Sequence, residues 1–334
     1  MAFLSWIPNG KFLGLLTIMF GIGVVIQQRS AQRHGRQWPG TYPVRCALLF
    51  LDGLVNYIFM VQFDVLRAYA VVAFIVAFLV LFSDRIQLWL AALFLAVHIG
   101  YLVYLTLQDN GGMPPPPPGP QLPEGSTDIG WWDLTLYNLQ NLPQAFMINA
   151  EFPTLAVMAV ALFLLGGAVY RHGVFEAGRR RLRYWLMAVG FGVALPADFT
   201  VSVLFPEYSS WGRYLFAAGV SFGLLALVTE YGVRRGGFGR TGTMMSLVGR
   251  MALTCYLLQN ILGVLGQYLV FNRDFFARLN YPAAAVGAWL AISAILIVFS
   301  WWLWLRKFDR GPAEILWHRA YDLTISGVRR VRSR

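Results

Sequence analysis

Residues 249–260 read GRMALTCYLLQN and open an apolar segment that continues to residue 271. An arginine and several hydrogen-bonding side chains interrupt an otherwise hydrocarbon-like sequence. Polar groups inside a membrane cost free energy, so each of them is a candidate for a functional role. The stretch therefore predicts a membrane-spanning helix with a polar face.

The composition extends this prediction to the whole chain. Of 334 residues, 57% are hydrophobic and 13% charged, whereas soluble proteins have about 25% charged residues. We expect an all-α, polytopic bundle of transmembrane helices. The net charge of +11 comes from arginines in short clusters between apolar segments, where they act as topology signals, so no nucleic-acid partner is expected. Cys46 and Cys255 lie in apolar segments, which predicts free buried thiols.

Hydropathy predicts nine membrane spans, since about 20 apolar residues cross a bilayer as a helix. They are residues 12–27, 44–60, 66–82, 87–107, 152–170, 185–204, 212–231, 251–271 and 282–305. We expect four regions: N-terminal transmembrane helices (1–107), an external Pro-rich loop (108–140), C-terminal transmembrane helices (141–310) and a basic cytoplasmic tail (311–334).

The charges predict how the chain is oriented in the cell membrane. Every second connection is basic, and basic connections stay in the cytoplasm: 29–36, Arg85, 171–183, 234–240 and the tail from residue 306. The 108–140 loop has four acidic residues and no Lys or Arg. We expect it outside, the C-terminus in the cytoplasm and the N-terminus outside. An external N-terminus with so few residues before the first span raises the question of a further helix upstream.

The external loop combines a polyproline segment, residues 114–118, with an aromatic segment. The aromatic segment is expected to form an interfacial helix or a re-entrant cover, because aromatic rings prefer the headgroup level. Its residues are Trp131, Trp132, Leu134, Leu136 and Tyr137. The simpler interpretation is a spacer with an aromatic belt; the functional one is a lid over an external cavity.

The helical period of span 251–271 places Tyr256, Asn260, Gly263 and Gln267 on one face, with Gln259 beside it. Such a face either bonds to neighbouring helices or lines a hydrated pocket. Arg250 either extends to the membrane surface or holds a phosphate or carboxylate.

Further polar residues lie in or next to other spans. Asn56 belongs to the second span, and Asp64 and Arg67 lie three residues apart at the following turn, where a local ion pair is the simpler interpretation. His98 is the one histidine predicted inside a span. It is either satisfied by a neighbouring helix or a general base.

Several motifs are absent from the sequence. It has no Walker loop, no paired Cys or His spacing for a metal and no Gly-x-Ser-x-Gly elbow. An ATP-driven pump and a zinc hydrolase are therefore not expected, and no metal is predicted.

Four blocks of sequence resemble the YeiB-like family of bacterial membrane proteins, a domain of unknown function. They are MFGIG at 19–23, DVLRAYA at 64–70, the 249–260 stretch and GPAEILW at 311–317. The resemblance implies a relation to transmembrane acyltransferases such as the heparan glucosaminide acetyltransferase. It also implies an additional N-terminal helix with an Asp-x-Leu-Arg-Gly-type signature, before the point where this chain begins. Where the family tends to have Leu-His, this chain has Val55-Asn56.

Two main hypotheses follow, with a third behind them. In the first, an acyltransferase moves an acyl group from acyl-CoA to a cell-envelope glycan or lipid. His98 is then the base, Arg250 holds the donor phosphate, and the remaining substrate-binding residues are Asn56, Asp64, Arg67, Tyr256, Gln259, Asn260 and Gln267. In the second, a transporter or flippase uses the same polar face as a pathway. The third is a non-catalytic membrane subunit. Membrane lipids, a second copy or a partner subunit are the expected partners.

Overall fold

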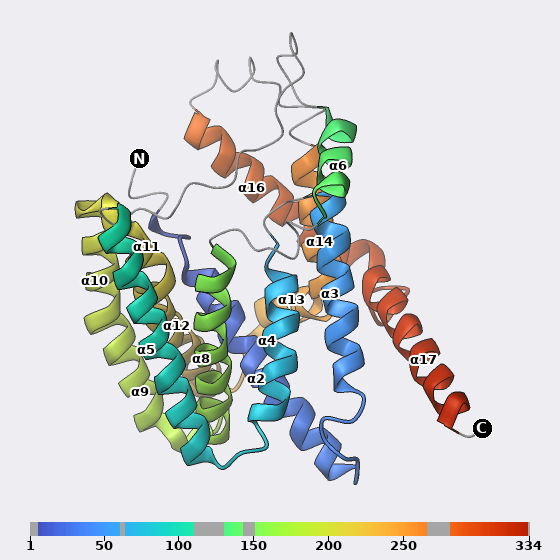
Figure 1. Ribbon diagram of the computed structural model, residues 1–334, viewed down its shortest axis with the longest axis horizontal. Coiled ribbons are helices and arrows are strands. Elements are labelled where there is room, and N and C mark those ends of the chain that lie inside the picture. The colour runs from blue at the N-terminus through green and yellow to red at the C-terminus, as the bar shows by residue number, and fades with distance from the viewer. Residues whose placement is uncertain (1–5, 61–63, 110–129, 143–150, 266–280, 333–334) are drawn as a thin grey trace. The chain divides into compact units, whose positions relative to one another are not determined.

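The computed structural model describes residues 6–60, 64–109, 130–142, 151–265 and 281–332. Every regular element in these ranges is a helix (Figure 1). The chain divides into two compact units, which are described separately. Unit 1 comprises Met1–Phe50, Val65–Gly119 and Phe146–Gly236, and unit 2 comprises Leu51–Asp64, Pro120–Ala145 and Gly237–Arg334.

Unit 1 contains most of the long helices. They are α2 (Lys11–Arg33), the first half of α3 (Tyr42–Phe59), α4 (Val65–Leu79), α5 (Asp84–Asp109), α8 (Glu151–Arg171), η1 (Ala177–Arg179), α9 (Arg180–Val189), η2 (Gly190–Ala194), α10 (Leu195–Phe199), η3 (Thr200–Leu204), η4 (Pro206–Tyr208), α11 (Ser209–Trp211), η5 (Gly212–Phe216) and α12 (Ala217–Arg235). Helix α8 packs against α2, α4 and α5 (Figure 1).

Small residues permit the close approach of α2 and α8. A Cβ atom on Gly21 would lie 2.3 Å from the backbone oxygen of Phe163, and one on Gly166 would lie 2.6 Å from that of Ile18. Contacts of this kind are typical of membrane helices, where small residues let two backbones pack directly.

Two buried ion pairs connect distant parts of unit 1. Lys11 Nζ lies 2.7 Å from Asp198 Oδ2, and the Trp6 indole donates to the same oxygen at 2.8 Å. Arg183 Nε donates to Glu230 Oε2 at 2.6 Å, and only 1% of the Arg183 side chain is exposed. Such partners offset the cost of burying charge, so removing one member of either pair would leave the other charge buried and uncompensated.

Unit 2 contains the second half of α3, α6 (Trp131–Gln140), α13 (Gly239–Arg250), α14 (Ala252–Leu265), α16 (Tyr281–Val298), η7 (Phe299–Trp304) and α17 (Pro312–Arg332). The expected aromatic segment is helix α6. The Trp131 indole donates to the Phe59 carbonyl at 2.8 Å, and Asn138 Nδ2 donates to the Tyr57 carbonyl at 3.1 Å. Both acceptors belong to the last turn of α3, whose carbonyls have no partners within their own helix.

The apolar helices show an integral membrane protein, but the expected count of nine spans is not confirmed. Within the described residues, six helices are long and apolar enough to cross a membrane: Lys11–Arg33, Tyr42–Phe59, Asp84–Leu107, Thr154–Arg171, Ala177–Leu204 and Pro206–Arg235. A bent pair, Gly242–Arg250 with Ala252–Leu265, would make seven. The expected span 66–82 corresponds to α4, which has only 15 residues.

The eighth expected span, 251–271, begins where the hydropathy placed it, since α14 starts at Ala252. The chain bends by 81° between α13 and α14, directly after Arg250. Helix α14 therefore begins at a corner, with its own N-terminal amides in need of partners. Residues 266–271 of this expected span lie outside the described residues.

Candidate functional site

Four expected site residues form one hydrogen-bonded group in unit 2, called here the polar cluster: Asn56, Asp64, Tyr256 and Asn260. Asn56 Nδ2 donates to Asp64 Oδ1 at 3.0 Å, and the Tyr256 hydroxyl donates to the same oxygen at 2.5 Å. Asn56 Oδ1 in turn accepts from Asn260 Nδ2 at 3.0 Å. The cluster thus joins α3 to α14 across about 200 residues of sequence.

The polar cluster has a buried side and a more open side. Asn56 is fully buried and Asp64 is 5% exposed, whereas Tyr256 and Asn260 are half-buried. The last two share a face of α14 because they are four residues apart. A carboxylate thus lies behind a hydroxyl and an amide that a bound molecule could contact.

The N-terminus of α14 is capped by a carboxylate from α17. Glu314 Oε1 accepts from the backbone N–H of Leu253 at 2.8 Å and of Thr254 at 3.1 Å. The Thr254 hydroxyl donates to Glu314 Oε2 and accepts from the Ala313 N–H at 3.0 Å. An acidic group at a helix N-terminus satisfies free amides and complements the helix dipole.

Gly311 completes this junction. A Cβ atom there would lie 2.2 Å from Glu314 Oε2 and 2.4 Å from Thr254 Oγ1, so a side chain at this position would force one of these two groups to shift. Two blocks of the family resemblance, 249–260 and 311–317, therefore meet in one structural element. Their separation in sequence concealed this contact.

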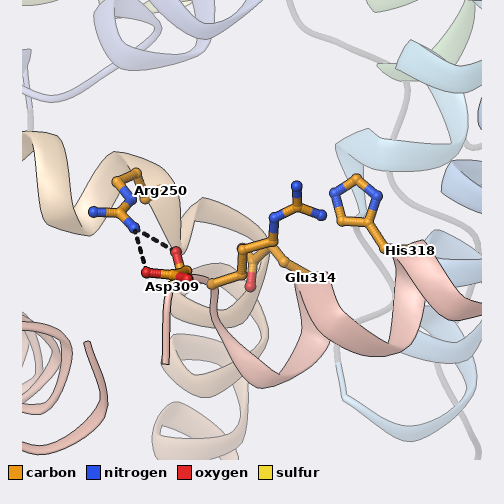
Figure 2. Close-up of a pocket in the computed structure, with 5 residues that line it drawn as sticks. Arg250, Asp309, Glu314 and His318 are labelled. Carbon is orange, nitrogen blue, oxygen red and sulfur yellow. Dashed lines mark hydrogen bonds and ion pairs between the residues drawn. The ribbon is translucent and has the colours of Figure 1, made fainter. Parts of the chain in front are cut away.

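A pocket of about 340 Å³ opens beside the junction, lined by Arg250, Asp309, Arg310, Glu314 and His318. Figure 2 shows Arg250 and His318 on opposite sides of it, with Glu314 between them. Arg250 Nη2 donates to the backbone carbonyl of Asp309 at 2.5 Å and lies 4.0 Å from its carboxylate. About half of the Arg250 side chain (49%) remains exposed, so its guanidinium can also reach a ligand.

Other expected site residues lie elsewhere. His98 is fully buried on α5 in unit 1, with Nε2 3.0 Å from the Tyr214 carbonyl oxygen. This hydrogen bond engages Nε2 only, as expected for a histidine held by a neighbouring helix, and the role of His98 as a general base stays a prediction. Arg67 is buried on α4 of unit 1. Gln259 is half-buried on α14, and Gln267 lies outside the described residues.

Sequence reasoning did not select Asp309, Arg310, Glu314 or His318 as site residues. Glu314 lies inside the GPAEILW block, two residues after its proline, and an acidic residue in a first helical turn is a recognisable signal. Nothing in the sequence indicates that this carboxylate caps a different helix. Among the described residues, no three His, Cys, Asp or Glu side chains gather to hold a metal ion.

Comparison with known proteins finds a family model and two relatives, but no solved structure that matches. The family model "Protein of unknown function (DUF418)" matches residues 169–324. The chain is 26% identical to the uncharacterized protein YxaH of Bacillus subtilis (strain 168) over 96% of its length and 81% of YxaH. It is 27% identical to the uncharacterized protein YeiB of Escherichia coli (strain K12) over 95% of its length and 83% of YeiB. These matches confirm the resemblance found in the four sequence blocks: the chain is similar to the YeiB-like proteins over most of its length, and residues 169–324 match the DUF418 family model.

Proposed function

We propose that the protein is a membrane-bound acyltransferase that uses the polar cluster of unit 2. The observation that carries the proposal is the buried Asp64 carboxylate, which is hydrogen-bonded to Asn56 and Tyr256. Acyl transfer needs a proton acceptor, hydrogen-bond donors for the developing oxyanion and a group that holds the donor. Unit 2 offers candidates for all three.

The donor side of the proposal is the Arg250 pocket. A guanidinium binds phosphate through a planar fork of N–H donors, and acyl-CoA carries phosphates remote from its thioester. From Thr254, which hydrogen-bonds to the pocket residue Glu314, to Asn260 the helix rises about 9 Å. The flexible arm of acyl-CoA can cover that distance, so a donor held at Arg250 would present its thioester to the polar cluster.

The acceptor side is the half-buried edge of the polar cluster. An acceptor hydroxyl or amine attacks the thioester carbonyl, the C–S bond breaks and the thiolate leaves. Asp64 takes the acceptor proton and passes it to the thiolate, while Tyr256, Gln259 and Asn260 orient the acceptor or polarise the carbonyl. The half-buried side chain of Gln259 makes no hydrogen bond to the described part of the chain, so its amide is available for this role. In this scheme Asp64 replaces His98 as the base.

The acceptor in this proposal is a glycan or lipid of the cell envelope. The donor, acyl-CoA, comes from the cytoplasm, which the basic connections are proposed to face. A structural interpretation uses the same hydrogen bonds: the polar cluster would then only hold α3 against α14, since amide contacts between membrane helices are common. A transporter would use the half-buried edge as part of a pathway. An activity assay separates these interpretations.

The test uses the full chain in nanodiscs with radiolabelled acyl-CoA of several chain lengths and an envelope lipid and glycan extract. We expect transfer by the wild type and a loss of about 10²-fold or more in Asp64→Asn, which keeps the shape but cannot accept the proton. Asp133→Asn, an exposed carboxylate on α6, is the matched control and should retain activity.

Melting curves of both variants give the activity per folded molecule. If the wild type neither transfers nor hydrolyses the acyl group, the acyltransferase proposal fails. Movement of a labelled lipid between leaflets in the same discs would then favour the flippase. If Asp64→Asn melts early but keeps its activity per folded molecule, the cluster is structural.

A further inference from the structure

Helix α17 has two different faces. Leu316, Ala320 and Leu323 share one face by their spacing of four and three residues. Leu316 is 71% exposed and Leu323 is 72% exposed, although both are large apolar side chains. On the opposite face, Glu314 and His318 line the pocket (Figure 2). Helix α17 is therefore amphipathic, and its apolar face has no cover within the described residues.

The apolar face cannot turn inward, because the first turn of α17 is fixed. Glu314 accepts two backbone hydrogen bonds from α14, and Gly311 packs directly against Thr254. These contacts set the rotation of α17 about its own axis. The face of Leu316 and Leu323 is consequently held on the side away from the pocket.

The surroundings of α17 indicate what covers this face. The helix follows the apolar helices α16 and η7 after a short connection, so we expect its start near a membrane surface. The rings of Trp317 and Tyr321 stack with centroids 5.7 Å apart, and aromatic side chains are enriched at the headgroup level. Arg319 is exposed, and the sequence ends with four further arginines, at 329, 330, 332 and 334.

We infer that α17 lies in the surface of the membrane, with Leu316, Ala320 and Leu323 among the acyl chains and its basic residues at anionic headgroups. Helices with one apolar face and a basic polar face bind membranes in this way, and anionic lipids strengthen the binding. The pocket then faces the aqueous side, which gives a water-soluble ligand access to Arg250. This inference does not depend on the proposed enzymatic activity.

The test places a fluorescent probe on each face of α17 in the full chain. Leu323→Cys and the matched variant Asp322→Cys, whose native side chain is exposed, are labelled with an environment-sensitive fluorophore. Cys46 and Cys255 are buried, and labelled wild type measures their background. The proteins are reconstituted in phosphatidylcholine nanodiscs with and without phosphatidylglycerol.

We expect a blue-shifted emission at 323 that brominated acyl chains quench and aqueous iodide does not, with stronger quenching by bromine when phosphatidylglycerol is present. The probe at 322 should show the reverse. Equal quenching by iodide at both positions would overturn the inference, because the apolar face would then be in water. Protection from iodide at 323 without quenching by brominated lipid would also overturn it, since a protein surface would cover the face.

Discussion

Removing the Glu314 carboxylate should release the N-terminus of α14. This side chain accepts two backbone hydrogen bonds, from Leu253 at 2.8 Å and Thr254 at 3.1 Å, and a third from the Thr254 hydroxyl. In Glu314→Ala, the two amides lose their partner at the corner where α13 ends. The variant should therefore loosen the first turn of α14 and detach α17 from it.

The size of the effect follows from the bonds that are lost. A hydrogen bond to a charged group contributes about 1.5–3 kcal/mol, and loss of a helix N-cap costs about 0.5–2 kcal/mol. The three hydrogen bonds share one carboxylate and the site is partly open, so their free energies do not add fully. We therefore expect Glu314→Ala to lower the free energy of unfolding by about 2–4 kcal/mol. Thr254→Val should cost about 1–2 kcal/mol. The double variant should cost less than the sum of the two, because both remove the same contact.

Unfolding of the full chain in mixed micelles measures these free energies, and hydrogen exchange at Leu253 and Thr254 locates the change. Asp309→Ala is the control, because its carboxylate borders the same pocket but is fully exposed; it should change stability by less than about 0.5 kcal/mol. The reasoning is refuted if Glu314→Ala is as stable as Asp309→Ala, or if the two amides exchange no faster than in the wild type.

Three further predictions concern other parts of the chain. Gly311→Ala should destabilise the protein by about 1–3 kcal/mol in the same unfolding assay, because its methyl group would meet the capping carboxylate; Gly249→Ala, with open space around it, should be nearly neutral. His98→Ala should cost about 2–4 kcal/mol, because it leaves a cavity and removes a hydrogen bond, yet it should keep its activity per folded molecule. A drop of about 10²-fold in that activity would instead support His98 as the base. A cysteine tag at Glu124 should react with an impermeant reagent on intact cells and one at Arg179 should not; the opposite labelling would reverse the predicted orientation.

The sequence was a good guide to where the helices lie. The expected spans 12–27 and 152–170 correspond to α2 and α8, because a long apolar segment has few alternatives to a membrane helix. The shared face of Tyr256 and Asn260 is also observed, since it depends only on the helical period. These features are local, so neighbouring residues are enough to specify them.

Features that depend on distant residues were not predictable in the same way. The hydropathy placed the start of a span at residue 251, but it gave neither the bend of 81° there nor the capping carboxylate, which comes from Glu314, about 60 residues later. The sequence could select Asn56 and Asn260 separately, but not the hydrogen bond between them. His98 shows the opposite problem: its residue type suggested chemistry, and only the structure shows its carbonyl partner.

The pocket has a stronger positive character than the equal numbers of arginines and acidic residues in its lining suggest. Two arginines face two acidic residues there, which would give no net preference for an anion. However, the Glu314 carboxylate is already satisfied by the amides and hydroxyl at the start of α14, and the Asp309 carboxylate is fully exposed, where water screens its charge. Arg250 meets mainly a neutral backbone carbonyl. Its positive charge is thus only weakly compensated, and this residual charge makes a phosphate the natural ligand to test in the pocket.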